Sequence, residues 1–324
     1  MDKTAEKKDS IFSKLSRVSG TGALLPLLII IIFLSIFTKS FLTTSNIMQV
    51  LRQAAVYSIM ATGMTFVIIT GGIDLSQGSV LALCCVTSAF TINSTGNMWL
   101  GIIVAILTGA VVGLVNGVVV AYIKIPAFIM TLGSLYVVRG LTLYITNSTQ
   151  VAVQHDKFKV IGQGFLFNIP IPVYIFLIVG AIAYIILEHT ATGRYIFAIG
   201  SNEATTRLSG VKVERNIIKA YLFSGICVAL AAVVYLSRLS AAQPTAGQSY
   251  ELEAIAAVVI GGTSIAGGEG GIFGTLVGAV IIAIIRNGLV LLGVGSFFTQ
   301  IVVGLIIVGA VSLDVIRRRL AMNK

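Results

Sequence analysis

Long runs of apolar residues alternate along the chain with short polar or glycine-rich breaks. Most runs approach about 20 residues, the length that an α-helix needs to cross the hydrocarbon core of a bilayer. The pattern therefore predicts an all-α polytopic membrane protein with about ten transmembrane helices. The expected spans are residues 23–38, 47–70, 77–95, 98–121, 126–146, 171–188, 216–238, 252–267, 271–285 and 298–313. An even number of spans places both termini on one side.

Two places in this pattern combine paired glycines with hydroxyl residues. The first contains Gly71, Gly72, Asp74 and Ser76, and the second contains Gly261, Gly262 and Thr263. Glycine adopts dihedrals that other residues resist, and backbone freed from helical pairing is tolerated at membrane depth only beside protein or water. Transporters place such broken helices on solute paths. An equally good interpretation is a tight turn between adjacent spans, with Asp74 at the cytoplasmic surface capping the next helix.

Polar residues inside the predicted spans are mostly uncharged. The candidates for lining a solute path are Asn116, Thr131 and Ser134. Thr131 and Ser134 share a face of the fifth span by helical spacing and could border a water-filled route. Ser and Thr also hydrogen-bond to their own helix backbone, so a structural role explains them equally well. Since Arg139 is the main charged residue inside a span, a neutral polar solute fits better than an ion.

The composition excludes an ordinary soluble protein. Of the 324 residues, 56% are hydrophobic and only 10% are charged, whereas soluble domains carry about 25% charged residues. Too few residues remain for a separate soluble domain, so a self-contained ATPase is disfavoured. Cys84, Cys85 and Cys227 fall within apolar runs and are expected to be small helix residues rather than disulfide partners.

The net charge of +10 indicates orientation in the membrane. Of the 22 Lys and Arg residues, five precede residue 18, five lie between residues 189 and 219, and four lie in the C-terminal tail. By the positive-inside rule these segments and both termini are cytoplasmic, and no nucleic-acid partner is needed to explain the charge. Residues 1–20 lack the apolar stretch of a cleavable secretory signal. The expected organisation is a cytoplasmic segment 1–22, one transmembrane domain 23–313 with a cytoplasmic loop 189–215, and a cytoplasmic tail 314–324.

No catalytic, cofactor or metal site is expected. His155 and His189 fall in loops on opposite sides of the predicted membrane, and no His, Cys and carboxylate cluster has zinc-ligand spacing. The sequence also lacks a Gly-x-Ser-x-Gly nucleophile elbow and a Gly-Lys-Ser/Thr phosphate-binding loop. Catalysis by this chain alone is therefore not expected.

The polar loop between the sixth and seventh spans predicts a short helix outside the membrane. Ser201 or Asn202 can cap its start, Glu203 suits its positive end, Arg207 suits its last turn, and Gly210 can end it. A helix of this size can dock in a groove of a soluble partner and transmit movement to the flanking spans. A solvated connector on the lipid headgroups is the alternative.

Five segments carry a family resemblance. They are 71–79 (GGIDLSQGS), 193–211 (GRYIFAIGSNEATTRLSGV), 242–247 (AQPTAG), 253–264 (EAIAAVVIGGTS) and 287–294 (NGLVLLGV). Together they resemble the sugar permeases of ABC importers, in the branched-chain amino acid/sugar permease family, and most of all the ribose-transporting members. The resemblance covers nearly the whole chain. Gln77 departs from the small apolar residue expected before Gly78.

The resemblance implies a type II ABC-importer-like fold in the plasma (inner) membrane of a bacterium. The implied partners are a second permease copy in a homodimer, a cytoplasmic ABC ATPase with two nucleotide-binding cassettes and an extracytoplasmic sugar-binding protein, with membrane lipid around them. The implied substrate is a monosaccharide, with ribose favoured, imported at the expense of ATP hydrolysed by the separate subunit. The loop helix then matches the ATPase-coupling helix, with Asn202, Glu203, Ala204, Arg207, Leu208, Ser209 and Gly210.

Two other functions compete with an importer permease. An ion-gradient-driven secondary transporter of a small polar solute would use Asp74 as its coupling carboxylate, but the 193–211 motif argues against it. An integral membrane enzyme would need a convergent set of acid, base, nucleophile or metal ligands, which the sequence lacks.

Overall fold

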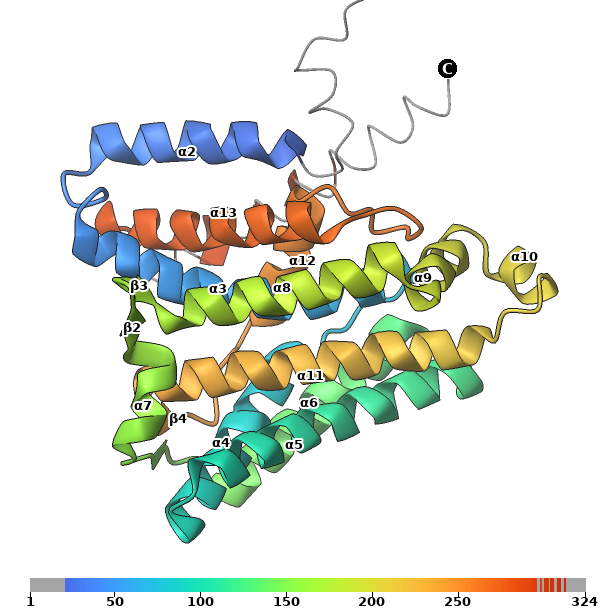
Figure 1. Ribbon diagram of the computed structural model, residues 1–324, viewed down its shortest axis with the longest axis horizontal. Helices are drawn as coiled ribbons and strands as arrows, with labels where there is room; N and C mark the ends of the chain where they lie inside the picture. Colours follow the sequence, from blue (N-terminus) through green and yellow to red (C-terminus); the bar gives the residue numbers. More distant parts are fainter. Residues whose placement is uncertain are drawn as a thin grey trace, which may run out of the picture.

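Helices lie side by side between two ends of the molecule in the computed structural model (Figure 1). The structure describes residues 21–295, 298, 300–302, 304–305, 308–309 and 312. The helices are α2 (Leu24–Phe37), α3 (Thr44–Ile69), α4 (Gln77–Thr95), α5 (Met98–Val118), α6 (Ala127–Thr146), α7 (Asp156–Gln163), α8 (Ile171–His189), α9 (Ala191–Ser201), α10 (Glu203–Leu208), α11 (Val213–Leu239), α12 (Tyr250–Ile260) and α13 (Ile272–Leu291). A 3-10 turn, η1 (Thr21–Ala23), precedes α2, and a π-helical segment, η2 (Val119–Ile123), extends α5.

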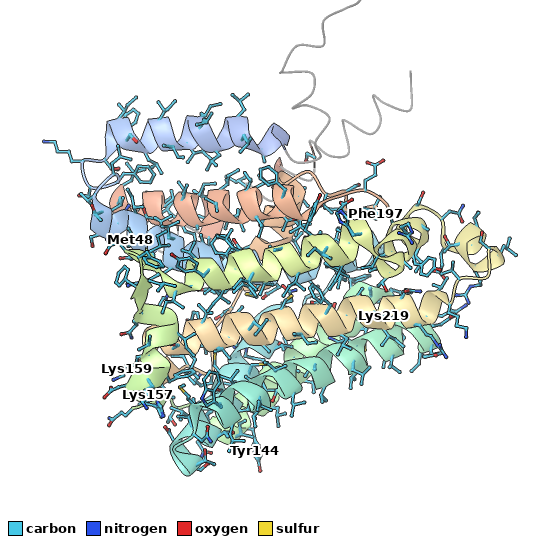
Figure 2. All side chains as sticks on the ribbon, in the orientation of Figure 1. Met48, Tyr144, Lys157, Lys159, Phe197 and Lys219 are labelled. Carbon is cyan, nitrogen blue, oxygen red and sulfur yellow. The ribbon has the colours of Figure 1, made fainter. Side chains whose placement is uncertain are left out.

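The two ends are named after the short helices they carry, the α7 end and the α10 end (Figure 1). At the α7 end, strand β1 (Val151–Ala152) pairs with β4 (Ala241–Ala242), and β2 (Phe165–Leu166) pairs with β3 (Ile169–Pro170), both antiparallel. Figure 2 shows Lys157 and Lys159 at this end and Lys219 toward the other.

Seven of the described helices are long and apolar enough to cross a membrane: α3, α4, α5 with η2, α6, α8, α11 and α13. The predicted all-α polytopic class is therefore confirmed. The first expected span corresponds to α2, which has only 14 residues, and the tenth, 298–313, lies partly outside the described residues. The total of about ten spans and the position of the termini stay predictions.

The eighth expected span is not one helix. The prediction of a span over 252–267 is wrong, because α12 has only 11 residues and ends at Ile260, before the Gly261-Gly262 pair. The glycine pair marks this place in the sequence as a possible break, and the structure shows that the helix ends there. The ninth span is longer than expected, because α13 runs from Ile272 to Leu291.

The core of the molecule surrounds α3. Every residue from Ala54 to Ile69 is buried, and α3 contacts α8, α11, α12 and α13. The outer helices α2, α5, α6 and α8 instead expose large apolar side chains, among them Phe33, Ile103 and Tyr136. Exposed apolar helix faces of this extent suit lipid or a second copy of the chain.

Small residues bring α5 and α11 into backbone contact. A Cβ added at Gly109 would lie 2.3 Å from the carbonyl oxygen of Gly225, and one at Gly113 would lie 2.4 Å from that of Tyr221. Gly109 and Gly113 therefore serve helix packing, which supplies the cohesion that lipid does not.

Replacing Gly113 with leucine is expected to destabilise the fold by forcing the two helices apart. Overpacking of this kind costs about 1–3 kcal/mol, which thermal unfolding in detergent measures as a lower midpoint. The matched control is Gly140→Leu on α6, because a Cβ at Gly140 meets nothing within 4 Å. Equal midpoints for the two variants would contradict the packing role.

Candidate functional site

The two glycine pairs end their helices with the same hydrogen-bond pattern. After α3, Gly71 N donates to Ile68 O (2.8 Å) and Gly72 N donates to Val67 O (3.1 Å). After α12, Gly262 N donates to Val259 O (2.9 Å) and Thr263 N donates to Val258 O (3.1 Å). Gly71 and Gly262 hold the same left-handed position, with φ of 83° and 92°, as in a Schellman cap. Both pairs are therefore helix ends.

Asp74 lies in a buried hydrogen-bond network behind the first of these ends. Its Oδ1 accepts from the Ser76 amide (3.1 Å) and hydroxyl (2.6 Å), and its Oδ2 accepts from the Ser224 hydroxyl (2.9 Å). Asn116 Nδ2 donates to the Ser76 hydroxyl (2.9 Å), and Gln77 Nε2 donates to the Ser224 hydroxyl (3.0 Å). Two amide-to-hydroxyl chains thus converge on one carboxylate and join the start of α4 to α5 and α11.

This network lies inside the helix bundle. Ser224 is near the middle of the 27-residue α11, and Asp74 is 3% exposed. A position of Asp74 at the cytoplasmic surface is therefore wrong, because residues 70–76 turn back from the end of α3 toward the interior. None of the ion pairs among the described residues involves Asp74.

The other candidate path residues divide between this region and elsewhere. Thr131 Oγ1 donates either to Ile73 O (3.0 Å) or to Ala127 O of its own helix (2.9 Å), so it connects α6 to the 70–76 segment. Ser134 is half-buried on α6 and takes no part in the Asp74 network. Thr263 lies beyond α12, where its hydroxyl accepts from Gly271 N (3.3 Å). The structure thus joins Asp74, Ser76 and Asn116 in one network, brings Thr131 to the carbonyl of Ile73, the residue before Asp74, and leaves Ser134 apart.

The two helix ends meet each other at the end of α9. Gly268 N, in the loop after α12, donates to Ile69 O at the end of α3 (2.9 Å). Gly200 of α9 covers this bond so closely that an added Cβ would lie 1.7 Å from Ile69 O and 2.4 Å from Gly268 N. The end of α9 thus touches the backbone of both broken segments.

A pocket of about 240 Å³ opens beside this junction. Its lining brings together the first glycine pair and α10, and includes Gly71, Gly72, Lys124, Glu203 and Tyr221. The first glycine pair and the loop helix lie far apart in the sequence. In the structure, residues of both border one cavity.

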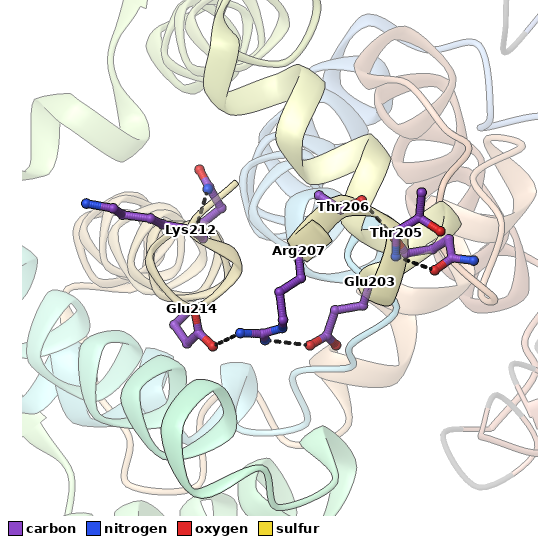
Figure 3. A network of polar contacts seen from close by, with 8 residues as sticks. Glu203, Thr205, Thr206, Arg207, Lys212 and Glu214 are labelled. Atoms are coloured by element: carbon purple, nitrogen blue, oxygen red, sulfur yellow. Dashed lines mark hydrogen bonds and ion pairs between the residues drawn. The ribbon is translucent and has the colours of Figure 1, made fainter. Parts of the chain in front are cut away.

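The loop helix forms as predicted, with Asn202 rather than Ser201 as its cap. Asn202 Oδ1 accepts from Thr205 N (2.9 Å), and Gly210 follows the helix with φ of 81°. Arg207 bridges Glu203 (2.9 Å) and Glu214 at the start of α11 (2.5 Å), as Figure 3 shows. Hydrogen bonds with Glu214 and then Glu203 raise the pKa of Arg207.

The side chain at the tip of α10 remains without cover. Leu208 is 89% exposed, more than any other large apolar side chain described. Since Arg207 holds the helix against α11, Leu208 is presented on a fixed support.

Several residues of this region escape prediction from sequence. Gln77 and Ser224 complete the Asp74 network, yet lie 147 positions apart. Gln77 does carry a signal, as a polar residue where the family resemblance predicts a small apolar one. Gly200 carries none, because an isolated glycine in a loop has no expected partner.

Two arginines inside the protein have partners that the sequence does not reveal. Arg286 lies within α13 and pairs with buried Glu253. The predicted ninth span ends at residue 285 and so places Arg286 in a loop. Arg139 points into the protein, where its Nη1 donates to Pro244 O (2.6 Å) and Ala246 O (2.9 Å).

Comparison with known proteins places the chain among transport permeases. Residues 46–311 match the family described as "Branched-chain amino acid transport system / permease component". The ribose import permease protein RbsC of Escherichia coli (strain K12) is 45% identical over 296 residues, covering 90% of this chain and 92% of the relative. RbsC of Bacillus subtilis (strain 168) is 44% identical over 295 residues, covering 90% and 92%. The D-allose transport system permease protein AlsC of E. coli (strain K12) is 37% identical over 311 residues, covering 96% and 95%.

No solved structure matches the chain. The bacterial relatives and the seven membrane-length helices confirm the expected bacterial membrane location. The relatives also confirm a permease subunit rather than an enzyme. The chain belongs to the permease-component family of the branched-chain amino acid transport systems.

Proposed function

We propose that this chain is the membrane-spanning permease of a binding-protein-dependent ABC importer that carries a monosaccharide, with ribose as the first candidate, into the cell. The observation that carries this proposal is the 45% identity to a ribose import permease over 90% of the chain. Relatives named for allose and xylose, at 37% and 33% identity, support a sugar as the substrate class.

The α10 end is assigned to the cytoplasm. Basic residues gather there among the described segments: Lys124, Arg194, Arg207, Lys212, Arg215 and Lys219. The positive-inside rule then places the α7 end outside. A two-cassette ATPase docks at the α10 end, a sugar-binding protein delivers solute at the α7 end, and two copies of the chain enclose the path.

The α10 helix is the proposed contact with the ATPase. Its exposed Leu208 suits a hydrophobic groove in a partner, and the Arg207 bridge to Glu203 and Glu214 fixes its orientation. Because Gly200 touches Ile69 and Gly268, a displacement of α9 and α10 reaches both broken helices at once. ATP-driven movement of α9 and α10 thereby shifts the positions of the helix ends beside the solute path.

Reconstitution tests the proposal. The chain is purified with its ATPase subunit, placed in liposomes with binding protein outside and ATP inside, and assayed for uptake of labelled ribose. Uptake is expected to need both ATP and the binding protein, and to persist when ionophores collapse ion gradients. Competition by unlabelled ribose, xylose and allose identifies the preferred sugar. Uptake by the chain alone that an ionophore abolishes would instead establish a secondary transporter.

A further inference from the structure

One face of α3 carries a polar stripe from the α7 end to the middle of the molecule. Ser45, Gln49, Gln53 and Tyr57 lie four positions apart, so they stack along one side of the helix. The first three line a pocket of about 350 Å³ whose other lining residues are Arg52, Arg238 and Leu239. Gln53 Nε2 donates to the Tyr57 hydroxyl (3.3 Å). Tyr57 is buried at the midpoint of the 26-residue α3, so the stripe leads from an open pocket to the interior.

Aromatic rings gather at the inner end of this stripe. The Tyr57 and Tyr250 rings pack edge to face with centroids 5.0 Å apart, and Tyr235 packs in the same manner on Tyr250 at 6.2 Å. The Arg238 guanidinium, in the lining of the outer pocket, lies 5.9 Å from the Tyr235 ring. Two contacts, through Gln53 and through Arg238, therefore connect the pocket to the tyrosine cluster.

A buried ion pair completes the cluster. Arg286 donates from Nη2 to Oε1 of Glu253, whose residue exposure is 0%, and the Arg286 guanidinium lies 5.8 Å from the Tyr250 ring. Among the described residues, no hydrogen bond reaches Glu253 Oε2 or Arg286 Nε, although both atoms are buried. Charged pairs inside a membrane protein are costly and are characteristic of solute paths.

The backbone beside the cluster is not helical. Residues 243–249 run between β4 and α12, with φ of 68° at Gly247 and 67° at Ser249. Arg139 holds the Pro244 and Ala246 carbonyls. Gly247 lies against Gly78, where an added Cβ would be 2.2 Å from Gly247 O. Irregular backbone in a membrane protein is tolerated where protein covers it or where it borders a cavity, and transporters place solute sites at discontinuous helices.

The unpaired atoms specify the chemistry of a ligand. A carboxylate oxygen needs a donor, and a guanidinium N–H needs an acceptor. A hydroxyl group can act as both donor and acceptor. The tyrosine rings present apolar faces that suit the carbon skeleton of a sugar. The ion pair itself is neutral, so it favours an uncharged ligand.

We propose that the cluster of Tyr57, Tyr235, Tyr250, Glu253 and Arg286 is a transient site for a neutral polyhydroxylated solute midway through the membrane, entered through the pocket at the α7 end. This inference rests on the proposed import of a monosaccharide and assigns its position within the chain.

Thiol labelling of the complete transporter in liposomes tests this site. The three buried native cysteines, Cys84, Cys85 and Cys227, are replaced with alanine, and Gln53→Cys or Tyr57→Cys is introduced. A membrane-impermeant thiol reagent added outside is expected to modify both cysteines. Ribose, xylose or allose is expected to slow this modification about twofold or more when the sugar concentration is near its dissociation constant. Tyr144→Cys, at an 81% exposed position (Figure 2), is expected to react without sugar protection.

A conservative variant provides a second measurement. Tyr57→Phe is expected to lower sugar uptake by about two- to tenfold, the range for one lost hydrogen bond, whereas Tyr144→Phe leaves uptake unchanged. If wild-type vesicles import sugar but no sugar protects either cysteine and Tyr57→Phe transports normally, the site is wrong and the proposed function stands. Absence of any ATP-dependent sugar uptake by the wild-type complex overturns both.

Discussion

Replacing Gly200 with alanine is expected to uncouple ATP hydrolysis from sugar uptake. The new Cβ would fall 1.7 Å from Ile69 O and 2.4 Å from Gly268 N, and backbone atoms cannot move aside as a flexible side chain does. The end of α9 must therefore separate from one or both helix ends. Substitutions in coupling elements change coupling by up to about 2 kcal/mol, roughly 30-fold. The measurement is sugar uptake per ATP hydrolysed in the reconstituted complex.

The control for Gly200→Ala separates coupling from folding. Gly133→Ala introduces the same methyl group on α6, where nothing lies within 4 Å of it, and is expected to behave as wild type. Both variants should bind the ATPase subunit, since α10 itself is unchanged. Normal coupling in Gly200→Ala would show that the junction of α9 with the two broken segments does not transmit movement.

Replacing Leu208 with aspartate is expected to release the ATPase subunit. Leu208 is 89% exposed at the tip of α10, and a buried apolar anchor at an interface contributes about 2 kcal/mol, roughly 30-fold in affinity. A carboxylate there leaves a charge to be desolvated in the partner's groove. Co-purification and titration of the detergent-solubilised permease with its ATPase measure the loss.

A matched leucine at the opposite end is the control for Leu208→Asp. Leu166→Asp alters a 48% exposed leucine in β2 at the α7 end, and is expected to retain the ATPase. Because Leu208 is 89% exposed, Leu208→Asp removes little packing and is expected to unfold at the wild-type temperature. Full ATPase binding by Leu208→Asp would place the docking surface elsewhere.

The contrast between α10 and α12 shows how far local sequence reaches. The limits of α10 follow from its cap at Asn202, its acidic first turn and Gly210, all within nine residues. The end of α12 depends on the same kind of glycine cap, at Gly262, but the sequence does not show whether the glycine pair interrupts a span or ends it. The two helices differ in that the end of α12 packs against another segment. A Cβ added at Gly261 would lie 2.4 Å from the backbone of Gly274 in α13.

The membrane-spanning helices can be predicted from the amino-acid sequence alone, because long apolar segments in lipid must satisfy their backbone groups internally. The α10 helix can also be predicted from sequence, because its cap is local, and so can the family, because its motifs are visible as residue identities. Contacts between distant segments set the burial of Asp74, the contact of Gly200 with both helix ends and the pairing of Glu253 with Arg286. These depend on segments from 33 to 150 residues apart, and such contacts leave no periodicity in the sequence from which to read them.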